Sequence, residues 1–520
     1  MDHIEAQSPR VVGVLDMGAS AIRLVVGEIV PGQPIRVLEE ASRGVLLGRD
    51  TFSGGVIRPR TADAAFAALE GFKTIMEGFG VTEIHAVATS AVREARNGEL
   101  FLDLVRARAG LAFEIINEAE ESRLVFLAVR DALKRHAAMK AAWTLLAEVG
   151  GGSTSLTLLR HGQPLRSGLY ALGGVRLRQR LDLPRHGHEL QLALLKRAIA
   201  NVVDEIRLEI PLKRVTHVVA VGGDVRRAAA HILDQPAEGG PREIPREAFL
   251  AFCDEVEPLE DEALVSRFRL PGAEAETLVP SLLVYRAILA ETGARRLVVS
   301  EGSLRSGVFL DLLNPGDPSG EEDFERQVLA SAESLGHRYR FDRAHGRHVA
   351  MLATRLFDEL QAAHGLSRRE RLLLQTAALL HDIGVYVGLR AHHKHSEYLL
   401  AASQIFGLSG DDTRIVATIA RYHRRAFPQR SHLPYVELDH RDQLLVNKLA
   451  AILRVANALD AEHLQKVRDL RLVHRDRTWI LELDGSGDIT MEQIAATART
   501  DLFTQVFGRE VVIRAAGSAL

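Results

Sequence analysis

A glycine turn preceded by an acidic residue occurs twice in this chain, once near the N-terminus and once near residue 150. In the first copy an apolar run ends in Asp16 and is followed by Gly18 and Ser20, and in the second an apolar run ends in Glu148 and is followed by three glycines. A second apolar run follows each turn, which predicts a β-hairpin in both places. Glycine lets backbone N–H groups approach a phosphate closely, and a carboxylate can hold a divalent cation beside it. Two such hairpins facing each other would clamp a phosphorylated substrate.

The repeat and the linkers predict four segments along the chain. At 520 residues, two to four domains are expected. We predict two similar α/β halves at 1–135 and 136–314, separated from the rest by a linker rich in proline, glycine and acidic residues at 314–322. A helical domain is expected at 323–467, and a small α/β unit with the order β-β-α-β at 468–520.

The composition is that of an ordinary globular protein, with 47% hydrophobic and 26% charged residues. The net charge of −3 provides no global attraction for a polyanion, so we expect no nucleic-acid partner. The single cysteine, Cys253, fits a reducing compartment. The first ten residues do not resemble a signal peptide, and no apolar run approaches the roughly 20 residues that span a bilayer. These features predict a cytoplasmic protein with no membrane partner.

A candidate general base lies at the start of a predicted helix. A short strand at 113–116 is followed by Asn117 and Glu120 in the pattern of a capping box, so a helix is expected from about Glu118. Glu121 then falls in the first helical turn, just past a strand end, where clefts open in α/β proteins. Hydrolysis of a phosphoanhydride requires a group that takes a proton from water, and a glutamate in this position is suited to that role.

In the second half, we expect residues 170–177 to close the third strand.

Five segments together resemble the exopolyphosphatase/guanosine pentaphosphate phosphohydrolase (Ppx/GppA) family, within the sugar kinase–actin–Hsp70 superfamily. They are the two glycine turns at 16–24 and 148–154, the segments 88–97 and 115–124, and the segment 298–305. The resemblance covers nearly the whole chain. It implies two actin-like (ribonuclease H-like) halves followed by an all-helical HD-type domain and a small C-terminal α/β unit. It also implies a homodimer.

The resemblance implies a Mg²⁺-dependent hydrolase in which water attacks the terminal phosphate of inorganic polyphosphate or of guanosine pentaphosphate. The catalytic base would be Glu121, and Asp16 and Glu148 would hold Mg²⁺ directly or through water. Arginines are candidates for phosphate oxygens because a guanidinium binds them bidentately. The expected substrate-binding residues of this region are Gly18, Ser20, Arg23, Arg93, Arg96, Gly150, Gly151, Gly152, Ser153 and Thr154.

Several positions depart from the family's pattern. Ala19 and Ala21 stand in a loop that usually reads Gly-Ser-Asn-Ser, Glu148 replaces an aspartate, and Ser155 replaces a glutamate. Four alternatives to an exopolyphosphatase therefore stay open. They are a guanosine pentaphosphate phosphohydrolase, a non-catalytic polyphosphate or nucleotide sensor, a sugar or acetate kinase, and an HD-domain phosphohydrolase regulated by the first half.

The helical region contains its own candidate metal site. His345, the pair His381 and Asp382, and Asp460 match the spacing of an HD metal site, and His395 and His423 are further candidates. Imidazole and carboxylate together suit a transition metal or Mg²⁺. Basic residues gather in the same region and could track a phosphate chain longer than the catalytic pocket. The residues of this predicted track are Lys394, Arg424 and Arg425.

Overall fold

The computed structural model describes residues 9–30, 33–181, 187–234, 240–313, 318–403, 405–475 and 478–516. The chain forms two compact units, Met1–Glu321 and Glu322–Leu520, which are described separately. Residues 314–317 of the predicted linker, and residues 1–8 of the predicted non-signal N-terminus, lie outside the described ranges. In these ranges, no helix combines the length and the apolar character that crossing a membrane requires.

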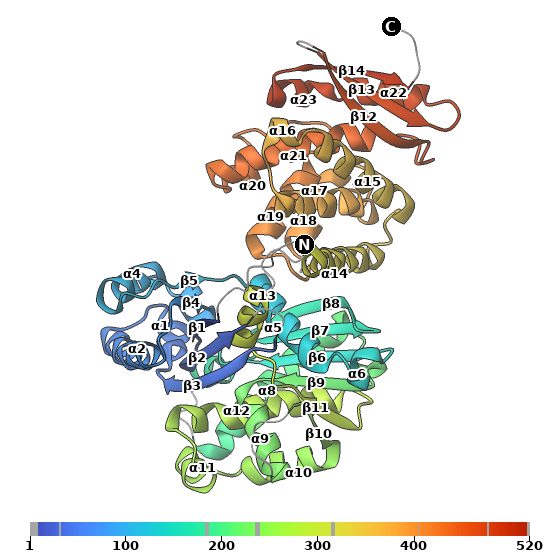
Figure 1. The fold of residues 1–520 in the computed structure, drawn as a ribbon. Helices are drawn as coiled ribbons and strands as arrows, with labels where there is room; N and C mark the ends of the chain where they lie inside the picture. The colour runs from blue at the N-terminus through green and yellow to red at the C-terminus, as the bar shows by residue number, and fades with distance from the viewer. Residues whose placement is uncertain are drawn as a thin grey trace. The chain divides into compact units, whose positions relative to one another are not determined.

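The first unit contains two mixed sheets (Figure 1). In the first sheet, the first strand of a β-hairpin pairs antiparallel with the second strand of the hairpin. On its other side it pairs in parallel with β4 (Glu83–Ala88). The strand order is β3 (Arg36–Gly44), β2 (Ala21–Ile29), β1 (Arg10–Met17), β4 (Glu83–Ala88) and β5 (Glu114–Ile115).

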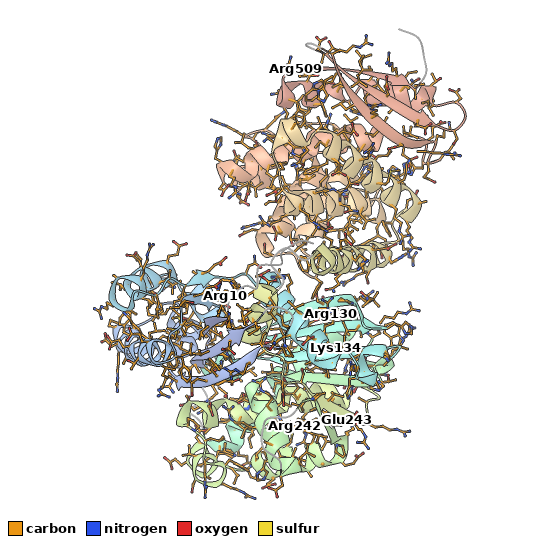
Figure 2. The ribbon with its side chains drawn as sticks, in the orientation of Figure 1. Arg10, Arg130, Lys134, Arg242, Glu243 and Arg509 are labelled. Carbon is orange, nitrogen blue, oxygen red and sulfur yellow. The ribbon has the colours of Figure 1, made fainter. Side chains whose placement is uncertain are left out.

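The second sheet repeats this plan and adds one antiparallel edge strand. Its order is β10 (Arg242–Pro245), β11 (Arg296–Val299), β9 (His217–Val221), β6 (Thr144–Val149), β7 (Thr154–Arg160) and β8 (Gln163–Tyr170). The edge strand β10 carries charge at Arg242 and Glu243, which Figure 2 labels. Glu243 forms an ion pair with Arg296 at 3.2 Å and lies 3.3 Å from Nε2 of His136. Charged side chains on an edge disfavour pairing with another chain.

The two halves correspond residue by residue at the strand ends. Asp16 on β1 lies opposite Arg23 of β2 and Val87 of β4. Glu148 on β6 occupies the same place between β7 and β9. The duplicated hairpins predicted from the sequence are therefore present, and the two acidic residues occupy equivalent positions in their sheets.

Helices pack against both sheets and bury a separate apolar core in each half. The helices of the first unit are α1 (Leu47–Gly54), α2 (Pro59–Gly78), α3 (Ser90–Arg93), α4 (Gly98–Ala109), α5 (Glu118–Leu133), α6 (Ala137–Lys140), α7 (Gly174–Arg180), α8 (His188–Glu209), the 3₁₀ turn η2 (Leu212–Arg214), α9 (Gly223–Leu233), α10 (Arg246–Val256), α11 (Asp261–Phe268), α12 (Gly272–Ala290) and α13 (Leu304–Leu313).

The prediction that residues 170–177 close the third strand of the second half is wrong. Strand β8 ends at Tyr170, and α7 begins at Gly174. The backbone N–H groups of Gly174 and Val175 donate to the carbonyls of Gly150 and Gly151 at 3.0 Å. This contact with the glycine turn starts a helix where the local apolar pattern favoured a strand, and a local pattern cannot reveal it.

The second unit is a helical bundle followed by a three-stranded sheet with two helices. The bundle contains α14 (Pro318–Arg338), α15 (Arg343–Glu359), α16 (Gln361–His364), α17 (Arg368–Leu380), the 3₁₀ turn η3 (Ile383–Tyr386), α18 (His392–Ala401), α19 (Gly410–Arg421), α20 (Leu433–Val436) and α21 (His440–Ala458). The sheet has the order β12 (Val467–Arg475), β13 (Thr478–Gly485) and β14 (Glu510–Ala515), with α22 (Thr490–Thr497) and α23 (Thr500–Phe507) between the last two strands.

Helix starts in this unit follow the capping signals of the sequence. The Asp342 side chain accepts from the backbone N–H of His345 at 3.1 Å, and Ser367 with Glu370 forms a complete capping box at the start of α17. The one helix expected in the β-β-α-β order of residues 468–520 is instead two helices, which separate at Ala498 and Arg499.

Gly307 allows α13 to pack closely on α5, the helix that carries Glu121. A Cβ atom at Gly307 would overlap the backbone carbonyl of Leu124. We expect Gly307→Ala to lower the free energy of unfolding of the first unit by about 1–3 kcal/mol, because backbone must move to admit the methyl group. The matched control is Gly71→Ala within α2, where nothing lies within 4 Å of the added atom. The control should stabilise by about 0.5–1 kcal/mol. Denaturant unfolding measures both, and equal effects would contradict the packing argument.

Candidate active site

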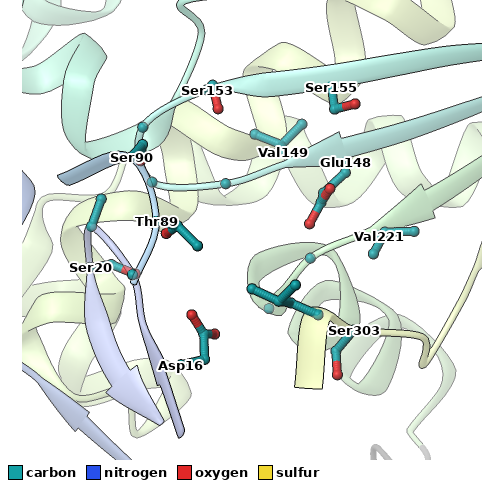
Figure 3. Close-up of a pocket in the computed structure, with 18 of the residues that line it drawn as sticks. Asp16, Ser20, Thr89, Ser90, Glu148, Val149, Ser153, Ser155, Val221 and Ser303 are labelled. Atoms are coloured by element: carbon teal, nitrogen blue, oxygen red, sulfur yellow. The ribbon is translucent and has the colours of Figure 1, made fainter. Parts of the chain in front are cut away.

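A polar pocket lies in the first unit, at the carboxyl ends of β1 and β6, with an empty volume of about 1120 Å³. Both glycine turns line it, together with the start of α5, the start of α9 and the segment before α13. Figure 3 shows Asp16 and Glu148 pointing into this pocket from different strands. The pocket therefore joins the two halves of the first unit.

The two glycine turns have the same backbone geometry and face each other. The N–H of Gly18 donates to the carbonyl of Ala21 at 3.1 Å, and the N–H of Gly150 donates to the carbonyl of Ser153 at 2.9 Å. A Cβ atom at Gly151 would lie 3.1 Å from the Cβ of Ala19, which shows how closely the turns approach. Side chains larger than hydrogen would separate them.

The second turn is also fixed by its neighbours. A Cβ atom at Gly152 would overlap the Ser90 hydroxyl, and one at Gly173 would overlap the backbone of Gly151 and Gly152. These glycines are required by the close approach of other atoms. Backbone N–H groups of the turn are thus held at the pocket wall by packing from several elements.

Glu121 is placed by the helix start that the sequence predicts. The Asn117 side chain accepts from the N–H of Glu120 at 2.9 Å, and α5 begins at Glu118. Glu121 lines the pocket, and its Oε2 lies 3.4 Å from Nη1 of Arg93. Burial raises the pKa of Glu121 to about 7; the guanidinium of Arg93 opposes this rise, and the charge of Asp16 adds to it.

Glu148 is the most strongly perturbed carboxylate of the pocket. Burial raises its pKa to about 8, and the negative charges of Glu121 and Asp16 contribute further. The charge of Arg226 acts in the opposite direction. Three carboxylates from three elements therefore influence one another across the same pocket.

Asp16 is held by two arginines. Nη1 of Arg305 donates to Oδ2 of Asp16 at 3.0 Å, and Nη1 of Arg23 lies 3.8 Å from the same oxygen. The sequence predicts that Asp16 holds Mg²⁺, and the charged neighbours that the structure gives it are these two guanidinium groups. Its side chain is nearly buried.

Three guanidinium groups crowd one side of the pocket. They belong to Arg23, Arg226 and Arg305. Burial, followed by the charges of Arg305 and Arg23, lowers the pKa of Arg226 to about 10. Burial also lowers the pKa of Arg305. Within the described ranges, Nη1 of Arg226 and Nε of Arg305 are buried without a hydrogen-bond partner. Buried cationic donors of this kind favour an anionic ligand.

Three of the predicted substrate-binding residues do not line the pocket. Arg93 stands behind Glu121 and donates from Nη1 to the carbonyl of Ile116 at 2.8 Å. Arg96 donates to the carbonyl of Gly54 at 3.1 Å, and the buried hydroxyl of Thr154 donates to the carbonyl of Leu172 at 2.6 Å. The pocket does contain the other predicted residues of the first unit, which are Asp16, Gly18, Ser20, Arg23, Glu121, Glu148, Gly150, Gly151, Gly152 and Ser153.

Sequence reasoning did not assign Arg226, Arg227 and Arg305 to the site. The internal repeat does point to Arg227. Val87 pairs with Asp16 and Val221 pairs with Glu148, so the two valines are equivalent. Arg227 follows Val221 at the same spacing at which Arg93 follows Val87. Arg305 ends one of the segments that carry the family resemblance. No local signal distinguishes Arg226 from a surface arginine.

Tyr285 of α12 lies where β6 and β9 separate beside the pocket. Its hydroxyl accepts from the N–H of Val149 at 3.0 Å and donates to the carbonyl of Val221. The last paired residues of these strands are Glu148 and Val221. The buried tyrosine thus satisfies backbone groups that the ladder leaves unpaired, and it lets the strand ends diverge.

The metal and track residues predicted for the helical region all belong to the second unit. His345, His381 and Asp382 lie close together, and Asp460 contacts His345. Lys394 and Arg425 are exposed, while Nη1 of Arg424 lies 3.3 Å from Nε2 of His392.

Two family models match the chain. Residues 25–315 match the Ppx/GppA phosphatase family, and residues 328–490 match domain III of the Ppx/GppA phosphatases. The first match begins after Asp16 and Gly18, and it includes Glu121 and Glu148. The second includes the histidines and arginines of the helical bundle.

Solved structures share the fold of the first part of the chain. An exopolyphosphatase from Cytophaga hutchinsonii superposes with a TM-score of 0.54 at 22% identity, covering 58% of this chain and 98% of its own. An exopolyphosphatase-like protein superposes with a TM-score of 0.52 at 20% identity, covering 59% of this chain and 98% of its own. At these identities the likeness establishes two actin-like α/β halves.

The raised pKa of Glu148 predicts a stability that depends on pH. The folded protein holds this proton more tightly than the unfolded chain, so ionisation of Glu148 lowers stability as pH rises from about 4.5 toward about 8. Glu148→Gln removes the charge. In the absence of divalent cations the variant should melt a few degrees above wild type at pH 8.5, and close to wild type at pH 4.

The control for this test is Glu120→Gln on α5, whose carboxylate pairs with Arg123 outside the pocket. The control should not melt above wild type at pH 8.5. Calorimetric melting at several pH values measures both variants. A Glu148→Gln protein that is less stable than wild type at pH 8.5 would contradict the assignment of a destabilising carboxylate.

Proposed function

The chain belongs to the Ppx/GppA phosphatase family, and from this premise we propose that it is a Mg²⁺-dependent exopolyphosphatase. In this proposal the terminal phosphate of inorganic polyphosphate lies in the pocket of the first unit. A water molecule attacks the phosphorus, and Glu121 takes the proton of that water. The bond between that phosphorus and the bridging oxygen breaks, and the shortened polyphosphate is the leaving group.

The observation that carries the proposal is the crowding of charges of both signs, most of them half-buried, in one pocket. Arg23, Arg226 and Arg305 repel one another, and two of them have buried donor atoms without partners in the described part of the chain. A phosphoryl group offers acceptor oxygens to such donors. Catalysis of phosphoryl transfer consists mainly of positioning and charge stabilisation, which is what this arrangement supplies.

The donor set of the pocket fits Mg²⁺. Mg²⁺ prefers oxygen ligands and is usually held by one or two carboxylates together with substrate phosphates. Asp16 and Glu148 would hold it, since both carboxylates point into the pocket. Burial, and after it the charges of Glu121 and Asp16, raise the pKa of Glu148, so a cation beside it would favour its charged form. When bound, the ion neutralises charge on the phosphate oxygens.

The residues of the chain divide the remaining tasks. The N–H groups of the glycine turns and the hydroxyl of Ser153 are placed to donate to phosphate oxygens. Glu121 has a pKa of about 7, so a large fraction is deprotonated at neutral pH and can still accept a proton strongly. Arg93 contacts the Glu121 carboxylate from behind and so orients the base.

The lining of the pocket favours the polymer over a nucleotide. None of the described residues that line it is aromatic, so a guanine base would find no stacking partner there. Guanosine pentaphosphate remains the second substrate to be assayed, because its terminal phosphate presents the same chemistry. Lys394, Arg424 and Arg425 of the second unit remain the predicted track for longer chains.

Glu121→Gln is the first test of the proposal. Gln cannot accept the proton, so phosphate release from long-chain polyphosphate with Mg²⁺ should fall by about 10²–10⁴-fold. Glu120→Gln, one residue away on the same helix and outside the pocket, should keep wild-type activity. Phosphate release is measured on polyphosphate and on guanosine pentaphosphate in parallel.

Each outcome of this assay assigns the substrate. Release from the polymer that depends on Glu121 supports the proposal, and release from the nucleotide alone would assign the second substrate. No release from either by wild type would contradict a hydrolase and support the sensor alternative raised by Ala19, Ala21 and Ser155. A Glu121→Gln protein with wild-type activity would contradict the role of Glu121 as the general base.

The pH profile tests the same base independently. Activity requires deprotonated Glu121, so kcat/KM should rise with pH through about 7. Arg93 lowers the pKa of Glu121 and Glu118 raises it. Arg93→Gln should therefore move the rising limb to higher pH, and Glu118→Gln should move it to lower pH. Shifts of the opposite sign, or no shift in either variant, would show that another group limits the rate.

A further inference from the structure

A second cluster of ionisable groups lies in the second unit, in the helical bundle. Asp382 follows α17, His392 begins α18, and His423 follows α19. The ligand atoms of these three residues all lie within 4.8 Å of one another. Both histidines are buried.

The distances converge on one oxygen. Oδ1 of Asp382 lies 3.2 Å from Nε2 of His392 and 3.3 Å from Nε2 of His423, and the two Nε2 atoms are 3.2 Å apart. Nε2 of His381 is 3.7 Å from the same oxygen. Yet this buried oxygen makes no hydrogen bond within the described residues.

The tautomers of the rings explain why no hydrogen bond forms. Nδ1 of His423 lies 2.7 Å from the carbonyl of Ala420, Nδ1 of His392 lies 3.1 Å from that of Leu389, and Nδ1 of His381 lies 2.7 Å from that of Ala378. A carbonyl only accepts, so each Nδ1 carries the proton. Each Nε2 then presents a lone pair.

Ring nitrogens and a carboxylate oxygen therefore face one another as acceptors, and Nη1 of Arg424 lies beside them as a donor, 3.3 Å from Nε2 of His392. Such an arrangement is unfavourable for the isolated protein and favourable around a cation. From this geometry we propose that Asp382, His392 and His423 bind a transition-metal ion, with His381 beside it. Two imidazole nitrogens and a carboxylate suit Zn²⁺, Fe²⁺, Co²⁺ or Mn²⁺ better than Ca²⁺, which prefers oxygen ligands.

This ligand set differs from the one predicted from the sequence. Asp460 accepts from Nδ1 of His345 at 2.8 Å and from the N–H of Gln465 at 2.7 Å, so it orients His345. A carboxylate behind a histidine fixes its tautomer and directs Nε2 inward. His345 and His463 form a second group with Asp382. Asp382 thus belongs to both groups.

Arg424 allows a test in which a substitution should strengthen metal binding instead of weakening it. Its Nη1 lies 3.3 Å from Nε2 of His392, where it donates to the lone pair that the metal would use. The guanidinium competes with the ion for this nitrogen and repels it by charge. Removing the guanidinium should therefore strengthen metal binding, and removing a ligand should weaken it.

The experiment uses the full chain, treated with a chelator and titrated with Co²⁺. Wild type should bind Co²⁺ with a visible ligand-field spectrum, and its melting temperature should rise with the ion. Loss of residues that only orient ligands costs about 10–100-fold in affinity, so Asp382→Asn and His423→Gln should lose at least about 100-fold. Arg424→Gln should bind several-fold more tightly than wild type.

Two controls separate this site from other causes. His364→Gln changes a buried histidine of the same unit that hydrogen-bonds only backbone groups, and it should keep the spectrum. Glu148→Gln alters the pocket of the first unit and should also keep it, so failure here and failure of the phosphatase proposal can be told apart.

Two results would overturn the proposed metal site. A wild-type chain without the spectrum and without a Co²⁺-dependent rise in melting temperature would overturn the proposal. Equal affinity in wild type, Asp382→Asn and His423→Gln would also overturn it. If a ligand variant fails to fold, the wild-type melting shift and the direction of the Arg424→Gln change decide the question.

Discussion

Charge of both signs, buried where two sheets meet, is the constraint around which the first unit is built. Asp16 and Glu148 occupy equivalent ends of β1 and β6, so the duplicated topology brings them to one pocket. Neither carboxylate can leave, because each belongs to a central strand with neighbours on both sides. The guanidinium of Arg305 stabilises Asp16, whereas Glu148 has no hydrogen-bonded cation of comparable closeness and its pKa rises. This unequal pairing of the two carboxylates is what the proposed phosphate and Mg²⁺ would complete.

The surrounding fold maintains this unfavourable arrangement through close packing. Glycine turns that touch at Gly151 and Ala19, the buried hydroxyl of Tyr285, and the contact of α13 with α5 at Gly307 each fix a segment of the wall. Their combined effect is that donors stay in place before a substrate arrives, which is the requirement for stabilising charge in a transition state. Such sites lower stability locally, and the two apolar cores of the first unit offset that cost.

Local signals in the sequence predicted what depends on neighbours along the chain. The capping residue Asn117 fixed the start of α5 and hence the turn that holds Glu121, and the repeated acidic turns predicted two hairpins at equivalent places. Structural features that depend on contacts between residues far apart in the sequence were not predicted. Residues 170–177 end in a helix because α7 bonds to a loop more than 20 residues away, and Thr154 uses its hydroxyl on Leu172. Arg226 is recognisable only by its burial beside other arginines.

The two units present different chemistry to a cation, and this difference matters for how the protein would use metals. Asp16 and Glu148 offer oxygen atoms beside arginines that attract phosphate, so an ion there is held partly by its substrate. Asp382, His392 and His423 offer imidazole nitrogen, with tautomers fixed by backbone carbonyls, so an ion there is held by the protein alone. Imidazole nitrogen favours transition metals, and carboxylate with phosphate favours Mg²⁺. If both proposals hold, the imidazole ligands of the second unit would favour a transition metal, and the carboxylates of the first unit together with phosphate would suit Mg²⁺.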